Sequence, residues 1–542
     1  MWKERLNEAE RLRAAGRFGE AAEIYREVAV SVDPKSAPNL FGLAGLRGGA
    51  CAYRSGDATL ADELWSRVAK STDAPSEMRV DAAGNLAVLA MDTLDLVTAR
   101  VRVREALDLA KEGSHEAAAA RQWGNLALLD LRDGALDEAR RSFLRAAEHF
   151  DRAGDEQGLA QVWNALGEVA MRQGEHEAAG EYFSDAFECL AAHGALREAA
   201  VARANQAHLL KRQGQILKAR TLYQEVQAAL GSEGDAAAGA SLDLGATLMD
   251  LGDWPAAEEA LEQAESLATR PDLQARVALA RSGWLIEEER LIEALEVAKG
   301  AFEAFEALSS HRGMVGAWVI RARLEWRMGL EPAGLPEWAS SSDMADVQVA
   351  LQALVAEREL ARGDIEAARR LSEDFEAVLS RGGERLRALK AKAYSLRLDY
   401  LGGGLGLEAL SSGTTAISAQ MAADGATADA FGVAVQPILW LILKGDLAVA
   451  EHLLGRIEWE ERWPRGWKRS LARLERFATA AQGGEIATLE EGEEAQDVET
   501  RALEAFINGV ARGDDGARRA AVQTLQEKAR TFLANLLSRS SL

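Results

Sequence analysis

Glycine recurs along this chain at a spacing of forty residues or close to it, and this spacing constrains the fold more than any other feature. The glycines in this register are Gly16, Gly56, Gly134, Gly174, Gly214, Gly252, Gly329, Gly363, Gly404 and Gly445. The two longest gaps each span one further repeat, in which Leu94 and Glu289 stand at the glycine position. Such a period indicates a stack of similar supersecondary elements rather than separate globular domains.

Apolar residues keep a fixed distance from these glycines. The fifth residue onward is an alanine in eleven repeats: Ala21, Ala61, Ala99, Ala139, Ala179, Ala219, Ala257, Ala294, Ala368, Ala409 and Ala450. A large apolar residue usually follows four positions later, as Phe143 and Phe183 do, and this spacing lies on one helical face. A second apolar run precedes each glycine. Each repeat is therefore predicted to be helix, glycine turn, helix, because glycine ends a helix in the left-handed conformation without strain.

Composition agrees with a helical array and opposes several functions. Only 9 of 542 residues are proline, whereas 48 are glycine. The two cysteines cannot form a disulfide framework, so we expect a reducing, cytoplasmic environment. We find no ligand pair at metal spacing, no nucleophile elbow and no phosphate loop, and therefore predict no enzyme, no cofactor and no metal site.

The formal net charge of −23 opposes binding to phosphate backbones and to anionic lipid. No run approaches the ~18–20 apolar residues that span a membrane, so membrane insertion is not expected. Arginine outnumbers lysine. Alanine, glycine and glutamate are also abundant, and this composition is typical of a GC-rich bacterial genome. These features predict a bacterial protein whose partner is neither nucleic acid nor a bilayer.

Between Ala118 and Ala264 the repeats show an aromatic residue, a leucine with a small residue, the turn glycine, alanine, a second aromatic residue and alanine, in that order. The chain thereby resembles the tetratricopeptide repeat (TPR) family, in the forty-residue, long-helix variety of kinesin light chains and bacterial regulator arrays. The resemblance implies an all-α, right-handed superhelical α-solenoid of about thirteen helix-turn-helix repeats.

The regularity of the pattern divides the chain. We expect a regular TPR array at 1–330, degenerate TPR-like helical repeats at 331–500 and C-terminal capping helices at 501–542. Pro332, Pro336 and the run Gly402–Gly404 interrupt the middle part. Trp2–Arg13 is the expected N-terminal cap, and Ala517–Leu537 is the expected C-terminal one.

Asparagine recurs in the first helix of several repeats. Asn85, Asn125 and Asn205 stand nine residues before the glycine position, and Asn164 is one place off. Asparagine is a mediocre helix former, so its recurrence calls for a cause. In TPR proteins that bind extended peptides, an asparagine of this helix pairs with the ligand backbone, since its amide both donates and accepts. The alternative is a hydrogen bond between repeats that sets their stacking.

Arginine forms a second series two residues before the glycine, with Arg132, Arg172 and Arg212 forty residues apart. A basic line of this kind suits the carboxylates of a partner segment. The alternative is a cation that complements the carbonyl groups at a helix C-terminus.

A third candidate lies in the degenerate part of the chain. It comprises Trp459, Trp463, Trp467, Arg462, Arg465 and Arg469. Aromatic rings among arginines suit single-stranded nucleic acid or an acidic peptide. The alternative is that the tryptophans pack between helices while the basic residues neutralise the acidic block Glu485–Glu499.

These features favour a non-enzymatic scaffold or adaptor that binds a partner protein or peptide segment in a concave groove lined by the first helices. The alternative function is a ligand- or peptide-sensing regulatory protein that acts on a separately encoded effector.

Overall fold

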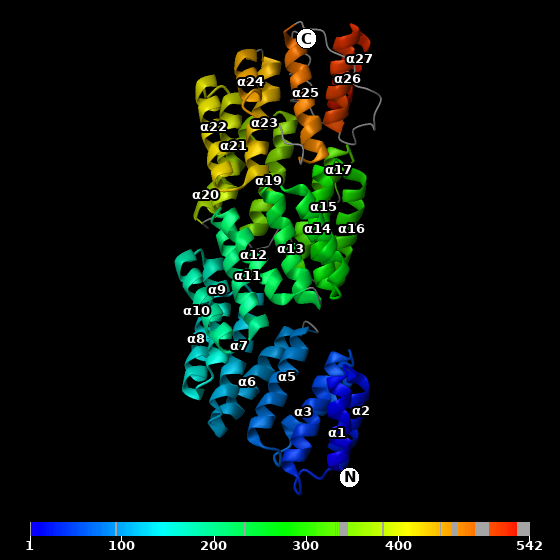
Figure 1. The fold of residues 1–542 in the computed structure, drawn as a ribbon, viewed down its shortest axis with the longest axis vertical. Helices are drawn as coiled ribbons and strands as arrows, with labels where there is room; N and C mark the ends of the chain where they lie inside the picture. The colour runs from blue at the N-terminus through cyan, green and yellow to red at the C-terminus, as the bar shows by residue number, and fades with distance from the viewer. Residues whose placement is uncertain are drawn as a thin grey trace. The chain divides into compact units, whose positions relative to one another are not determined.

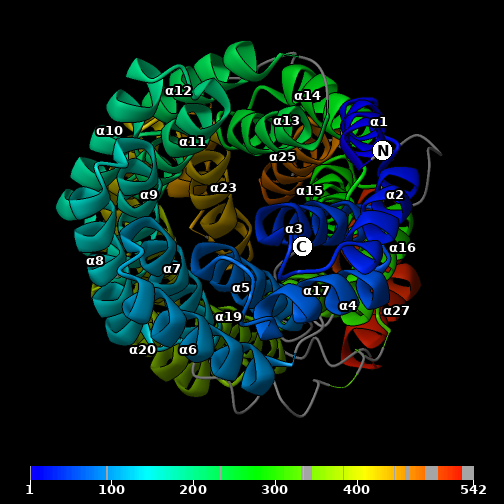
Figure 2. The ribbon, with the colours of Figure 1, turned by 90° about the horizontal axis from the view of Figure 1, so that it is seen from below.

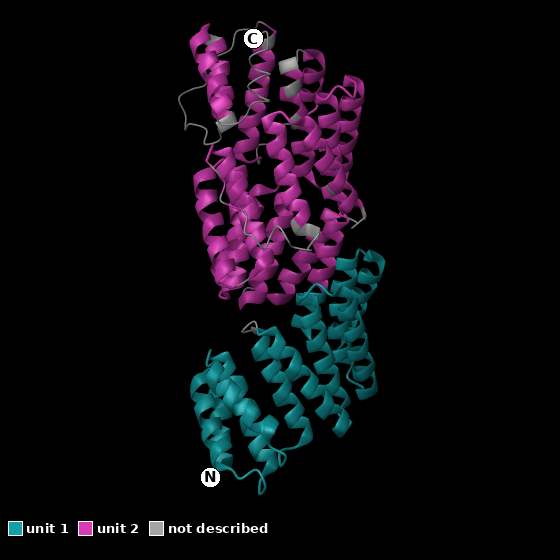
Figure 3. Cartoon of the chain, turned by 180° about the vertical axis from the view of Figure 1, so that it is seen from behind, with its two compact units in different colours: residues 1–202 teal, residues 203–542 magenta. Residues whose placement is uncertain are grey.

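The computed structural model describes residues 2–92, 95–231, 234–308, 310–330, 332, 334, 345–381, 384–444, 446–457, 463–482 and 498–527. Within these ranges the chain forms 26 helices and no strand, which confirms the predicted all-α class. The chain divides into two compact units, residues 1–202 and 203–542 (Figure 3). This boundary falls inside one helix, at a place that the sequence did not single out, whereas the predicted divisions at 330 and 500 stay predictions.

Unit 1 consists of consecutive helix pairs (Figure 1). The pairs are α1 (Trp2–Ala14) with α2 (Phe18–Ser31), α3 (Pro38–Arg54) with α4 (Ala58–Lys70), α5 (Ser76–Asp92) with α6 (Leu96–Gly113), α7 (Glu116–Arg132) with α8 (Leu136–Ala153), and α9 (Glu156–Gln173) with α10 (His176–Ala192). Within this unit the first helices α5, α7 and α9 lie on the inner side of the curve, and α6, α8 and α10 lie on its outer side (Figure 2). Helix α11 (Leu196–Arg212) contains the boundary.

Unit 2 continues the helix pairs. Its helices are α12 (Ile216–Leu230), α13 (Gly234–Asp250), α14 (Trp254–Leu267), α15 (Pro271–Glu287), α16 (Leu291–Ala307), α17 (His311–Arg327), α19 (Ala345–Arg362), α20 (Ile365–Arg381), α21 (Arg385–Leu401), α22 (Leu407–Ala423), α23 (Thr427–Lys444), α24 (Leu447–Leu454), α25 (Arg465–Ala481), α26 (Val498–Arg512) and α27 (Asp515–Glu527). The expected N-terminal cap is α1, the first helix of the first pair. Of the expected C-terminal cap, residues 528–537 lie outside the described residues. None of the described helices has the length and apolar character needed to cross a membrane.

The turn glycines adopt the conformation that the period predicts. Left-handed backbone occurs at Gly16, Gly56, Gly134, Gly174, Gly214, Gly252, Gly329 and Gly363. Glu289, which replaces the glycine in one repeat, also has a positive φ, of 58°. Leu94 and Gly445, at two other turn positions, lie outside the described residues.

The turn at 402–406 corrects the predicted register. Gly403 rather than Gly404 takes the left-handed conformation, with φ 81°. Three residues separate Gly403 from the start of α22. Leu410, which is 1% exposed, therefore takes the buried position that alanine occupies in other repeats. The predicted residue, Ala409, is exposed. The glycine run therefore lengthens this turn and shifts the helix that follows.

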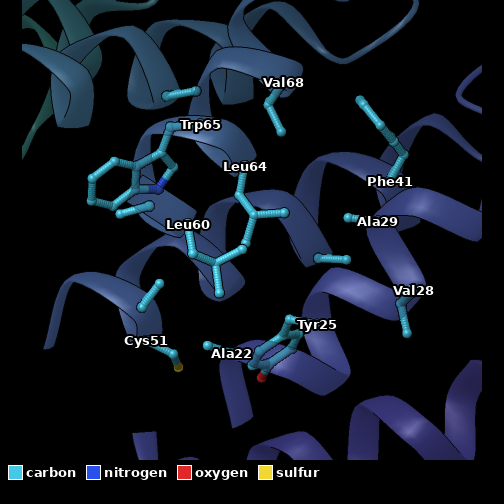
Figure 4. Close-up of a cluster of buried hydrophobic side chains, with 14 of the residues drawn as sticks. Ala22, Tyr25, Val28, Ala29, Phe41, Cys51, Leu60, Leu64, Trp65 and Val68 are labelled. Atoms are coloured by element: carbon cyan, nitrogen blue, oxygen red, sulfur yellow. The ribbon is translucent and has the colours of Figure 1, made fainter. Parts of the chain in front are cut away.

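Packing between the two helices of a pair explains the small residues of the period. Figure 4 shows the first such core, in which Tyr25, Phe41, Leu64 and Trp65 are buried together. The Trp65 indole N–H donates to the Leu46 carbonyl over 3.2 Å. Large side chains of second helices thus reach the backbone of first helices, and this close approach requires alanine or glycine opposite them.

Candidate functional site

A groove with a cavity volume of about 650 Å³ runs along unit 1. Helices α3, α5, α7 and α9 supply most of its lining, so first helices do form this surface as expected. In α5 the lining side chains are Asp81, Asn85 and Val88. This spacing of i, i+4 and i+7 lies on a single helical face. In α7 the same three positions line the groove with Arg121, Asn125 and Leu128.

The structure brings two of the four predicted asparagines into this groove. Asn85 and Asn125 are both half-buried. The Asn85 amide makes no hydrogen bond to another described residue. Asn125 Nδ2 donates to Gln122 Oε1 over 3.1 Å. Since each amide has two N–H groups and one carbonyl, a bound backbone would find both donors and acceptors here.

Gln122 is a buried polar residue of the same groove lining. Its side chain is 2% exposed and packs against the backbone of Gly84 in the preceding first helix. A Cβ atom at Gly84 would lie 2.3 Å from Gln122 Nε2, so a larger residue there would displace this amide.

Sequence reasoning missed an ion pair in the same groove. Arg121 of α7 and Asp81 of α5 lie 2.6 Å apart, and their side chains are 44% and 32% exposed. Each residue stands four positions before an asparagine of the predicted series. This spacing places it on the same helical face and could have indicated the pair. In α3 the asparagine position is taken by Arg47, which forms an ion pair with Glu10. The groove is therefore polar at one edge and apolar at the other, where Val88 and Leu128 lie.

The other two asparagines lie elsewhere. Asn164 in α9 is half-buried, but its neighbour Ala165 occupies the groove-lining position. The one-residue offset, about 100° around a helix, accounts for this difference. Asn205 belongs to unit 2 and does not line the groove of unit 1.

The predicted arginine series makes contacts within the chain. Arg132 Nη1 donates to the Met91 carbonyl at the end of α5 over 2.6 Å. Arg172 pairs with Glu168 one turn earlier in α9. In unit 2, Arg212 lies 2.5 Å from Glu384, a residue before α21. Arg132 thus complements a helix C-terminus, although that terminus belongs to the preceding repeat rather than to its own helix.

The third candidate, the tryptophan and arginine cluster, lies in unit 2. Trp463 and Trp467 are only 7% and 6% exposed. The Trp467 ring stacks on Phe431 at 4.3 Å between centroids, and its N–H donates to Glu287 Oε2 over 2.7 Å. These two rings therefore form part of a core and present no stacking surface to a partner. Trp459 and Arg462 lie outside the described residues.

The basic side chains beside these rings pair with acids of the turn after α15 and with an acid of α26. Arg469 lies 2.8 Å from Glu289, and Arg473 lies 3.1 Å from Glu289 and 3.2 Å from Glu504. The Arg465 backbone N–H donates to Glu288, and burial raises the pKa of that carboxyl. These contacts agree with the alternative in which the tryptophans pack between helices and acids of the same chain neutralise the basic residues. The acids differ from the expected block, of which Glu485–Asp497 lies outside the described residues.

Comparison with known proteins identifies the repeat. Residues 160–188, which cover most of α9 and α10, match the family model of the tetratricopeptide repeat. The fold is therefore that of a TPR α-solenoid, as the resemblance in the sequence predicted. A search of the curated proteins found no match to the sequence.

Several solved structures are similar to parts of this chain. The apo form of the quorum sensor NprR from B. thuringiensis is 12% identical, with a TM-score of 0.43, and the match covers 65% of this chain and 97% of that chain. A Rap protein complexed with competence and sporulation factor is 13% identical, with a TM-score of 0.39, over 60% and 97%. A tetratricopeptide repeat protein from Parabacteroides merdae is 12% identical, with a TM-score of 0.37, over 51% and 98%.

Proposed function

We propose that this chain is a non-enzymatic scaffold whose unit 1 groove binds an extended segment of a partner protein or a peptide. The observation that carries the proposal is the placement of Asn85 and Asn125 on successive groove-lining helices. Two amides in register match the repeating donor and acceptor of an extended backbone. Asn85 is half-buried and makes no hydrogen bond to another described residue, so a ligand would satisfy it.

The remaining lining indicates the kind of segment that would fit. Leu128 is 44% exposed and Val88 half-buried, so apolar side chains of a ligand would cover them. The Arg121–Asp81 pair at the other edge favours a segment with polar or charged residues of either sign. This scaffold would act in the cytoplasm, in keeping with two free cysteines, Cys51 and Cys189.

Peptide selection against the full chain tests the proposal. Peptides from a random displayed library should bind the wild-type chain, and Asn85→Ala and Asn125→Ala should each weaken the selected peptides by about tenfold, the value of one hydrogen bond of about 1.4 kcal/mol. Asn164→Ala is the matched control, because Asn164 is also half-buried in a first helix yet does not line the groove. Selected peptides that bind all variants equally, with unfolding unchanged, would contradict the proposal.

The regulatory alternative differs in what binding does. A regulator would change shape on binding and pass this change to a separate effector. Small-angle scattering of the full chain with and without a selected peptide distinguishes the two functions. A scaffold keeps its radius of gyration, whereas a changed radius would favour the regulator.

A further inference from the structure

The open end of the α9–α10 pair brings three metal-ligating side chains together. Glu156 is the first residue of α9, and Cys189 and His193 lie one turn apart at the end of α10. One ligand atom from each residue lies within 4.8 Å of the other two. Glu156 Oε2 is 3.2 Å from His193 Nε2, and Cys189 Sγ is 3.8 Å from His193 Nδ1. All three residues belong to unit 1 and are remote in sequence from the groove asparagines.

A hydrogen bond orients the imidazole of His193. Its Nδ1 lies 2.9 Å from the carbonyl oxygen of Cys189, which can only accept, so Nδ1 carries the proton. In the neutral ring the Nε2 lone pair then faces the Glu156 carboxylate, which is also an acceptor. Two acceptors at this distance repel unless a cation lies between them, either a proton on the ring or a metal ion. An N–H that donates to a backbone carbonyl is also the usual support of a metal-bound histidine.

We propose that Glu156, Cys189 and His193 form a binding site for a divalent transition-metal ion of the zinc class. Thiolate, imidazole and carboxylate together are ligands that zinc accepts in tetrahedral sites. Zinc bond lengths require neighbouring ligand atoms to be about 3.3–3.6 Å apart. Glu156 Oε2 and His193 Nε2, 3.2 Å apart, are already close to this spacing, whereas the Cys189 side chain must rotate to bring its sulfur from beside Nδ1 to this pair. Glu156 is 70% exposed, so water completes the fourth position.

Binding exchanges one proton for the ion. The Cys189 thiol donates to the Glu156 backbone carbonyl at 3.5 Å, and it must release this proton to become a ligand. The metal then forms a bond to sulfur and the proton passes to solvent, with no change of oxidation state. The ion would join the first turn of α9 to the last turn of α10.

The preceding repeat provides a control within the same molecule. Glu116 and His149 occupy the positions of Glu156 and Cys189, and the His149 Nδ1 lies 2.6 Å from Glu116 Oε2. Ala153 occupies the position of His193. This pair offers two donors and no thiol, so we expect it to bind the ion far more weakly.

Cobalt and zinc titrations of the full chain test the proposal. One equivalent of Co²⁺ should produce the charge-transfer band of a cobalt thiolate together with the d–d bands of a tetrahedral ion. Cys189→Ser should abolish the charge-transfer band, and His193→Asn should weaken zinc binding by more than about tenfold, measured against a chromophoric chelator. Zinc should also raise the Tm of the wild-type chain but not that of Cys189→Ser.

Two substitutions serve as controls. Cys51→Ala removes the other thiol and Glu116→Gln removes the carboxylate of the preceding repeat, and both should leave the cobalt spectrum unchanged. Circular dichroism confirms that each variant is folded. The proposal is overturned if no saturable binding occurs near one equivalent. It is also overturned if the band survives in folded Cys189→Ser or is lost in folded Cys51→Ala.

Discussion

Glu289 accepts a hydrogen bond from Arg473, a residue 184 positions later in the chain, and has a left-handed backbone in the turn between α15 and α16. Its other carboxylate oxygen accepts from Arg469 over 2.8 Å. The side chains of Glu289 and Arg473 are 16% and 11% exposed. Glu289 stands at a turn position where other repeats have glycine. Its side chain joins α25 to the turn that follows α15.

Substitutions at Glu289 separate the ion pair from the turn. Glu289→Ala removes the buried carboxylate and retains a residue that is strained at positive φ, so we expect the free energy of unfolding to fall by about 2–3 kcal/mol. Glu289→Gly also removes the carboxylate but relieves about 1 kcal/mol of backbone strain. Urea unfolding should therefore rank wild type first, glycine second and alanine third. The reverse order of the two variants would show that the turn is not strained.

Alanine substitutions at Gly167 and Gly124 should change the stability of the chain in opposite directions. A Cβ atom at Gly167 would lie 2.6 Å from the Phe183 ring, which is fully buried, so Gly167→Ala should cost about 1–3 kcal/mol. A Cβ atom at Gly124 meets nothing within 4 Å. Gly124→Ala should therefore be neutral or stabilising by up to about 1 kcal/mol, because alanine favours the helix. Equal Tm values for the two variants would refute the packing account of the small residues.

Arg132→Met tests which role the arginine series has. The substitution keeps an apolar stem but removes the donor to the Met91 carbonyl, so we expect a loss of about 1 kcal/mol in stability. Peptides selected on the wild-type chain should bind this variant unchanged. Weaker peptide binding at unchanged stability would instead favour contact with a partner carboxylate. Thermal unfolding and peptide titration of the same preparation measure both quantities.

Stability at acid pH should depend on Glu10. Burial raises the pKa of this carboxyl, but hydrogen bonds from Tyr25 and Arg13 and the charge of Arg47 outweigh burial, so its pKa lies below 4.5. A lowered pKa stabilises the folded state above the unfolded value of 4.5, and this stabilisation is lost as pH falls through the lowered pKa. Glu10→Gln should therefore lose stability at neutral pH and lose less than wild type on acidification. Unfolding curves across this pH range decide the point, and parallel pH profiles would contradict it.

Much of the fold followed from the sequence because its determinants are local. The turn glycines and the buried alanines obey the spacing of a helix and the low strain of glycine in the left-handed conformation. Local spacing did not identify the turn residue Gly403, and it wrongly placed Ala409 at the buried position. The run of glycines offered several possible turn residues, and the choice of Gly403 moved the buried position to Leu410.

The candidate sites needed more than periodicity. The series of asparagines indicated a helical face, but only Asn85 and Asn125 line the groove of unit 1. A shift of one residue along a helix changes the direction in which a side chain points. Asn164, one position off the series, therefore does not line the groove. The ion pair Arg121–Asp81 was missed because neither residue type departs from what an exposed helix usually carries.

The sequence by itself therefore determined the helix pairs, their turns and the small residues between them. Only the tertiary structure decided which distant groups meet: Trp467 with Glu287, Arg473 with Glu289, and Glu156 with Cys189 and His193. The physical reason is that helix register depends on neighbours three and four residues away. Contacts between repeats depend instead on how helices stack, and this stacking is set by the packing of many side chains together.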